Sequence, residues 1–336
     1  MPEKKGIDFG IRVPVSGPLA SAENIVQAAR EAESLGFDTI WVHDQLVWSQ
    51  EQNSHHVSSG SVEAVVPGRN PDFYESITTL GYLAGVTQRI KLGVAVVVLP
   101  LRNPVVLAKQ LLNLDVFSKG RLVLGVGAGA PLVGKTFQTV GVPFEKRGEI
   151  TDDYLRALLA IFSQQQQKSS YAGKYSNFSD VEIFPKSIQR PHPPIIVGGI
   201  GRALRRTAEF GDGWIPANIS AEKVELGIAK IKSMAARRGR KIEELIVGNE
   251  IFASVDRDSE TARRNASATI ASYARSIGRG SEDVTLLGST SEVSEKIERY
   301  HDSGVNMFEL KFIYKDMSSF LSQMRLFSSE ILRSFK

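Results

Sequence analysis

Apolar runs recur along the chain, and most are followed by a segment whose apolar residues repeat at helical spacing. Eight such runs predict strands, at 8–13, 39–43, 90–98, 121–125, 194–197, 213–215, 245–255 and 306–312. The first helix is predicted from Ser21, with Ile25, Ala28 and Leu35 on one face and Gly36 at its end. Regular alternation of strand and helix is typical of a parallel sheet.

Eight strand–helix units predict a closed (β/α)₈ TIM barrel with insertions, an α/β fold of about 250 residues in its minimal form. An open, doubly wound sheet is the alternative. The 336-residue length alone would suggest two domains. We interpret residues 1–336 as a single domain with insertions at about 44–72, 163–193 and 256–289, the second containing a hairpin-like aromatic stretch. Catalytic groups in such barrels follow the strand ends, so these positions hold the candidates.

The amino-acid composition excludes several classes of function. The absence of cysteine excludes disulfides, Cys-ligated metals and thiol catalysis. The net charge of +4 is spread along the chain, unlike the basic stripe of a nucleic-acid binder. No apolar run is long enough to cross a membrane, and the charged start lacks a signal-peptide pattern. We therefore expect a cytoplasmic protein that binds neither nucleic acid nor membrane.

Residues 129–136 match the P-loop pattern of nucleotide-binding proteins letter for letter. A P-loop needs a helix that starts at its Lys-Thr pair, here Lys135 and Thr136. Gly141 and Pro143 would end that helix within two turns. We therefore regard NTP hydrolysis as a minor alternative.

Two glycine-rich segments follow predicted strands. Gly125, Gly127 and Gly129 alternate, so one face of the strand end has no side chains. Either a flat ligand lies there against the backbone, or the glycines only form a tight turn. The second segment, residues 198–202, opens a helix, where exposed amides and Arg202 favour a phosphate.

Polar and aromatic residues gather after the second predicted strand, at Trp41–Trp48. His43 could be a catalytic group or a histidine satisfied within the core, and Trp48 could simply pack the loop. The adjacent pair His55 and His56 is unsuited to one metal ion, and no third ligand is evident. We predict no metal site.

Several motifs together resemble luciferase-like monooxygenases and deazaflavin-dependent oxidoreductases, of the bacterial-luciferase-like barrel fold. The resemblance covers nearly the whole chain and weakens after Ala217. Its segments are Pro100–Lys109, Leu114–Gly129, Gly141–Arg147, Arg190–Gly199 and Gly211–Ile215.

The resemblance implies a flavin-type cofactor across the strand ends. A non-proline cis peptide is implied at Ala95–Val96 on the third strand, against the cofactor ring. The resemblance places the phosphate near Gly198, Gly199, Gly201 and Arg202. Other implied cofactor-binding positions are Asp44, Ala95, Val96, Val98, Gly127 and Gly129.

The cofactor is either coenzyme F420, which transfers only hydride, or FMN, whose reduced form reacts with oxygen. Residues 44–48 resemble the Asp-His…Trp pattern of deazaflavin dehydrogenases, but Gln45 replaces the histidine that handles the proton. Ala130 replaces their acidic partner. Since glutamine is no general acid or base, we favour reduction over alcohol oxidation. His43, Gln45 and Trp48 are the predicted catalytic positions.

We predict an oxidoreductase that transfers hydride between F420 and a small organic substrate, with an FMN-dependent monooxygenase as the alternative. A non-catalytic flavin-binding barrel is a further alternative. The expected partners are a small-molecule substrate and a separate enzyme that reduces the cofactor. By analogy with the family, we expect a homodimer that pairs through helices near the second and third strands.

Overall fold

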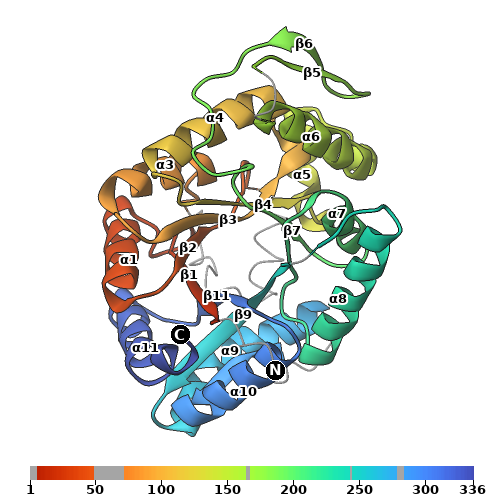
Figure 1. Cartoon of the computed structure of the whole chain (residues 1–336). Helices are drawn as coiled ribbons and strands as arrows, with labels where there is room; N and C mark the ends of the chain where they lie inside the picture. Colours follow the sequence, from red (N-terminus) through yellow and green to blue (C-terminus); the bar gives the residue numbers. More distant parts are fainter. Residues whose placement is uncertain (1–5, 49–71, 164–166, 243, 278–283) are drawn as a thin grey trace.

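A computed structural model describes residues 6–48, 72–163, 167–242, 244–277 and 284–336. Eight parallel strands close into a barrel in the order β1, β2, β3, β4, β7, β8, β9, β11, and hydrogen bonds between β11 and β1 complete the ring. The predicted (β/α)₈ barrel is therefore confirmed, and helices surround it (Figure 1). The strands are β1 (Asp8–Arg12), β2 (Thr39–Val42), β3 (Lys91–Val98), β4 (Leu122–Gly127), β7 (Ile195–Gly198), β8 (Gly213–Ile215), β9 (Ile246–Asp256) and β11 (Met307–Phe312).

The helices follow the predicted pattern closely. Pro104 begins α4, where a missing N–H costs nothing, and Asn103 caps the helix by accepting from two backbone amides. The helices are α1 (Ala22–Leu35), α3 (Ser76–Val86), α4 (Pro104–Phe117), α5 (Gly134–Val140), α6 (Arg147–Phe162), α7 (Arg202–Phe210), α8 (Ala221–Ala236), α9 (Ser259–Ile277), α10 (Thr290–Asp302) and α11 (Met317–Glu330).

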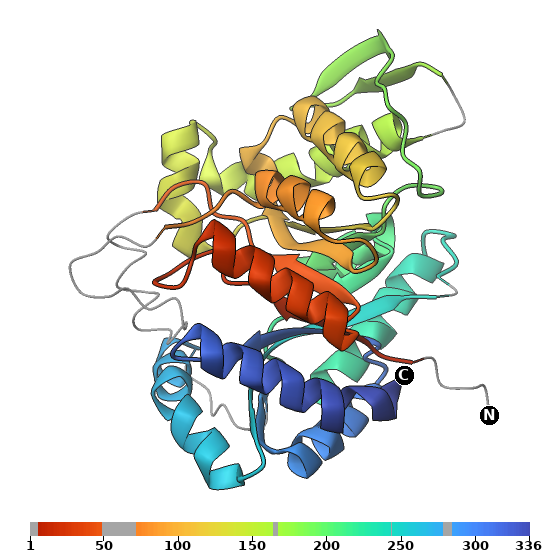
Figure 2. The same ribbon diagram turned by 90° about the vertical axis from the view of Figure 1, so that its left-hand side faces the viewer.

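The second predicted insertion has the expected hairpin, whereas the third contains a strand that was not expected. The predicted hairpin forms from β5 (Ser169–Ala172) and β6 (Asn177–Val181), outside the ring of helices (Figures 1 and 2). Asp153 of α6 anchors it by accepting from the Tyr171 hydroxyl and from three backbone amides. The structure adds β10 (Leu286–Ser289), which the sequence did not predict, alongside the outer part of β9.

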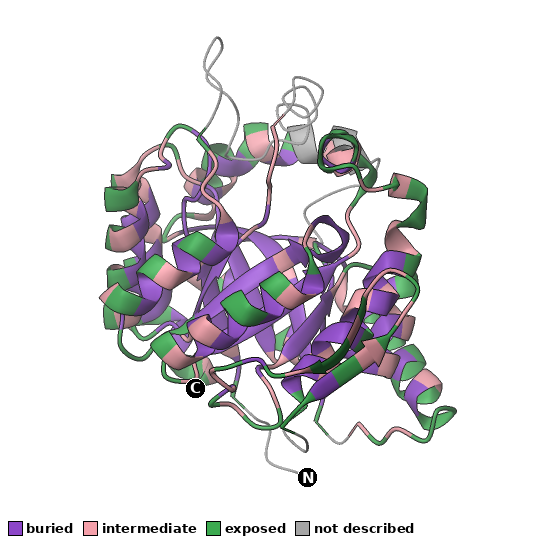
Figure 3. Cartoon of the chain, turned by 90° about the horizontal axis from the view of Figure 1, so that it is seen from above, coloured by how far each residue is buried: buried purple, intermediate pink, exposed green. Residues whose placement is uncertain are grey.

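The largest apolar cluster lies between barrel and helices, and a smaller one lies inside the barrel. Buried residues predominate on the barrel strands (Figure 3). Trp41 dominates the inner cluster together with Val123, Ile196 and Met307. A Cβ atom on Gly10 or Gly93 would lie within 2.3 Å of the Trp41 indole, so both glycines make room for this ring. This part of the barrel interior is thus packed with apolar side chains.

The segment before β1 meets the last residues of the chain, where the amide of Ile7 donates to the carbonyl oxygen of Phe335 at 3.0 Å. None of the helices in the described part of the chain has the length and apolar character needed to cross a membrane.

Candidate active site at the carboxyl ends of the strands

Val96, near the carboxyl end of β3, occupies space that two glycines leave. The Ala95–Val96 peptide bond is cis, as the family resemblance implies. A Cβ on Gly127 would lie 2.5 Å from Val96 Cγ2, and one on Gly198 would lie 2.6 Å from Cγ1. These glycines therefore surround a side chain, and the strand end is not the bare backbone of our first interpretation. Val96 stays partly exposed, so a ligand here would contact its side chain.

Gly129 is required by a tight turn. Its φ is +85°, and a Cβ there would lie 2.8 Å from the Phe137 ring and 3.0 Å from Val98 Cγ1. The Arg147 side chain donates to the Gly129 carbonyl oxygen at 3.2 Å. The turn interpretation thus explains Gly129 without a ligand.

Both carboxylate oxygens of Asp44 are engaged within the protein. Oδ2 accepts the backbone N–H of Val98 at 3.0 Å, and Oδ1 accepts the Ser76 hydroxyl at 2.9 Å. Arg102 Nη2 approaches Oδ1 to 2.5 Å and Glu75 to 2.7 Å. The Asp44 side chain is 1% exposed. Asp44 therefore positions the end of β3, which carries the predicted cofactor contacts.

Arg102 was not among the predicted site residues. It lies within the segment Pro100–Lys109, which carries part of the family resemblance, so that motif could have identified Arg102 as a candidate. Its partners Ser76 and Glu75 stand beyond residues 49–71, and no spacing rule connects them to Asp44.

His43 and Trp48 lie on either side of Phe73. The rings of His43 and Phe73 meet edge to face with centroids 4.6 Å apart, and Trp48 lies 6.1 Å from Phe73. His43 Nε2 is 3.3 Å from the Ser16 hydroxyl oxygen. Two of the three predicted catalytic residues are thus brought together. The pair His55 and His56 lies outside the described residues.

Gln45 is tied into its own loop. Its amide nitrogen donates to the carbonyl oxygen of Val47 and to Thr136 Oγ1 on α5, the latter at 3.3 Å. Thr136 is buried and also donates to Val47. Gln45 therefore fastens the loop to α5, and its amide is already engaged.

The same contacts argue against a P-loop. Helix α5 has seven residues and ends at Gly141 in the left-handed region, as the sequence predicts. The Thr136 hydroxyl, which would contact a metal ion in a P-loop, donates to Val47 instead. Lys135 Nζ contacts Gln138 Oε1 at 2.8 Å. The NTPase alternative is therefore not supported.

The start of α7 has the features of an anion site. Gly199, Gly201 and Arg202 are exposed, and no side chain caps the helix. The two glycines have φ values of +101° and +62°. The neighbouring helix α6 begins close by, since a Cβ on Gly148 would lie 3.9 Å from Arg202 Nη1. Open amides with a cation nearby suit a phosphate group.

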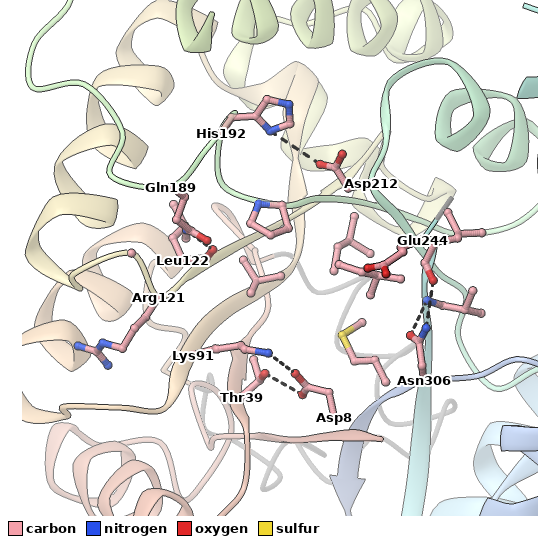
Figure 4. A pocket seen from close by; sticks show the side chains of 18 of the residues that line it. Asp8, Thr39, Lys91, Arg121, Leu122, Gln189, His192, Asp212, Glu244 and Asn306 are labelled. Atoms are coloured by element: carbon pink, nitrogen blue, oxygen red, sulfur yellow. Dashed lines mark hydrogen bonds and ion pairs between the residues drawn. The ribbon is translucent and has the colours of Figure 1, made fainter. Parts of the chain in front are cut away.

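A separate cavity of about 760 Å³ opens at the amino ends of the strands (Figure 4). Its polar groups are largely paired with each other. Lys91 Nζ contacts Asp8 at 2.8 Å, Thr39 also donates to Asp8, and His192 Nδ1 lies 3.8 Å from Asp212. These contacts give His192 a structural role. This end of a barrel usually serves stability, so the carboxyl ends remain the candidate site.

Comparison with known proteins identifies the family. Residues 7–307 match the profile of the luciferase-like monooxygenases. The chain belongs to the luciferase-like monooxygenase family. Members are oxidoreductases, and so is this luciferase-like protein.

The named relatives of this luciferase-like protein include a monooxygenase that uses reduced FMN and a reductase. The FMNH₂-dependent dimethylsulfone monooxygenase of Pseudomonas putida is 31% identical over 201 residues, which are 59% of this chain and 53% of that protein. The 5,10-methylenetetrahydromethanopterin reductase of Methanopyrus kandleri is 28% identical over 244 residues, 67% and 68% of the two chains. An uncharacterised protein of Mycobacterium tuberculosis is 32% identical over 219 residues, 63% and 74% of the two chains.

Solved structures agree on the fold alone. A monooxygenase from Streptomyces bottropensis has a TM-score of 0.79 at 20% identity, covering 98% of this chain and all of that one. An F420-dependent secondary alcohol dehydrogenase, in complex with an F420–acetone adduct, has a TM-score of 0.78 at 16% identity, covering 97% and 98%. The family thus includes both F420-dependent and flavin-dependent enzymes.

Proposed function

We propose that this luciferase-like protein is an F420-dependent reductase, which transfers hydride from reduced F420 to an activated double bond of a small organic substrate. The proposal rests on one observation, which is that position 45 is a glutamine whose amide is already hydrogen-bonded. The glutamine amide is neither an acid nor a base near neutral pH, and it is held by Val47 and Thr136. Within the described segment 43–48, that leaves His43 as the side chain suited to proton transfer.

The described residues fit a flavin-type group. The exposed residues Gly201 and Arg202 would hold its phosphate, whereas the amide of the neighbouring Gly199 already donates to the carbonyl oxygen of Ile215. The partly exposed Val96 would contact the ring. Gly127 and Gly198 lie against Val96 and Ala95 precedes it, while Gly129 lies against Val98, so these residues would shape that contact. Bound F420 would supply hydride chemistry, and Trp48 would shield the ring or stack on the substrate.

FMN-dependent monooxygenation is the second candidate function. The similarity to the dimethylsulfone monooxygenase favours it, because that relative uses reduced FMN. In that case a separate reductase would have to deliver the reduced flavin.

Titration of the purified protein with F420 and with FMN, followed by fluorescence, is expected to show the tighter complex with F420. The same preparation should then oxidise reduced F420 in the presence of an activated alkene, imine or carbonyl compound. Tight binding of FMN alone would overturn the proposal in favour of the monooxygenase.

Arg202→Ala is expected to weaken F420 binding by about 1–3 kcal/mol, the scale of a charge-assisted hydrogen bond. This corresponds to roughly a 5- to 150-fold rise in Kd. Arg237→Ala, at the end of α8, is the matched control and should leave Kd unchanged. Equal affinities of the wild type and Arg202→Ala would remove the phosphate from the start of α7.

We further propose a cytoplasmic homodimer. The outer faces of α3 and α4 expose Tyr82, Val106 and Phe117, which are 54%, 57% and 68% exposed. On α3, Gly81 and Gly85 have open space beside them, so a second helix could approach closely. Light scattering on the eluting protein measures the mass, and a monomer at micromolar concentration would contradict the dimer.

A further inference from the structure

Four charged side chains from three neighbouring strands gather inside the barrel. Along β11, Met307 belongs to the inner apolar cluster, so Glu309 and Lys311 face the same interior because side chains alternate along a strand. Glu250 stands directly opposite Glu309 on β9, and Arg12 ends β1 on the other side. Most residues of the barrel strands are apolar, so a group of four charged side chains in the barrel interior is exceptional.

The two carboxylates share one guanidinium. Arg12 Nε and Nη2 approach Glu309 Oε1 to 2.8 and 2.6 Å, and Nη2 also lies 3.0 Å from Glu250 Oε1. Lys311 Nζ contacts the same Glu250 oxygen at 2.8 Å. Lys311 also lies 3.9 Å above the Phe252 ring. Two carboxylate oxygens therefore lie less than about 6 Å apart, in a space largely closed to water.

The surroundings of the two carboxylates, Glu309 and Glu250, differ strongly. Glu309 is fully buried, and its Oε2 has no hydrogen-bond partner among the described residues. Glu250 is 22% exposed and has two cationic partners. A proton shared by two close carboxylates settles on the one with less solvent and fewer cationic partners, which here is Glu309.

The electrostatic surroundings agree with this assignment. Burial raises the pKa of Glu309 to about 7, and the charge of Glu250 adds to the rise, although Arg12 and Lys311 oppose it. Burial would raise the pKa of Glu250 as well, but Lys311, Arg12 and His43 outweigh it and hold that pKa at about 2. These groups, from β1, β2, β9 and β11, are the charged and titratable neighbours that act on the pair.

We propose that Glu309 stores the proton for the reaction and passes it, by way of Glu250, to His43. This inference rests on the proposed reductase function. Bound reduced F420 would supply hydride, with its two electrons, to one atom of the substrate double bond, and the neighbouring atom would then need a proton. His43 would donate that proton from its ring, and the proton of Glu309 would replace it, leaving Glu309 ionised until solvent protonates it again.

In this scheme Glu309 acts through His43, so it is a positioning residue. The location of His43 directly after β2 suits the relay, because His43 packs edge to face on Phe73 and its charge acts on Glu250, where it lowers the pKa. If the four charged residues had only a structural role, neither carboxyl group would need to be protonated.

The first test needs no cofactor. Carbon NMR of protein labelled at the glutamate carboxyl carbon is expected to show one carboxyl titrating near pH 7, and Glu309→Gln should abolish that titration. Glu149→Gln, at an exposed carboxylate on α6, is the control and should leave it in place. If no carboxyl titrates near neutrality in the wild type, the proposal is overturned whatever the enzyme reduces.

The second test is kinetic. With reduced F420 and an activated alkene, wild-type kcat should fall above pH 7, whereas Glu309→Gln should show no such fall and about a 100-fold lower kcat at pH 6 with KM unchanged. Glu309→Asp should recover part of the rate. A normal NMR titration with an unchanged pH profile in Glu309→Gln would refute the proton store and leave the reductase standing. A protein that reduces no substrate would refute the reductase, even with the titration intact.

Discussion

Asp44→Ala is expected to lower the free energy of unfolding by about 3 kcal/mol, the low end of the range for removing one partner of a buried ion pair. The low end applies because Arg102 would keep Glu75 as a partner. The substitution also leaves the buried N–H of Val98 without its acceptor, so the end of β3 should loosen and F420 affinity should fall. Urea unfolding followed by circular dichroism measures the stability change as a shift of the midpoint at constant slope.

A surface ion pair supplies the matched control. Lys168 contacts Asp180 at 2.9 Å, but the two side chains are 54% and 70% exposed. Lys168→Ala should therefore change stability by less than about 1 kcal/mol and leave the cofactor affinity unaltered. If Asp44→Ala were as mild as this control, the assignment of Asp44 as the positioning residue of β3 would be wrong.

The barrel was predictable because its strands are buried on both sides and therefore read as continuous apolar runs. The missed strand β10 shows the limit of that signal. It contributes four residues, one of them Gly288 with a φ of +134°, and pairs only with the part of β9 beyond the ring. Its pairing with β9 is what identifies it as a strand.

The candidate site was predictable where chemistry depends on residues close in sequence. The glycine turn before α7 followed from a local motif, and the family resemblance implied the cis bond at Ala95–Val96. Contacts across the barrel could not be predicted from local motifs, and Glu309 is an example. Alternation puts Glu309 and Lys311 on one face of their strand, but only the closed ring shows that this face points inward toward Glu250.

Gly125→Ala is expected to lower the free energy of unfolding by about 3 kcal/mol, the upper part of the usual range for overpacking. The new Cβ would lie 2.1 Å from the carbonyl oxygen of Val94, a backbone atom that no rotamer change can move away. It would also lie 3.2 Å from Val96 Cγ1, so any relief must displace the segment that carries Val96. The variant should therefore lose cofactor affinity together with stability, and both are measurable by urea unfolding and fluorescence titration.

Gly134→Ala separates this effect from the general cost of altering a glycine near the site. Gly134 begins α5 with a φ of −56°, and a Cβ there meets nothing within 4 Å. Alanine at such a position should leave stability unchanged or raise it by up to about 1 kcal/mol, because it restricts the unfolded chain. Should Gly125→Ala match this control in both stability and affinity, β3 would have room to shift, and Val96 could not serve as the fixed surface on which the proposed cofactor rests.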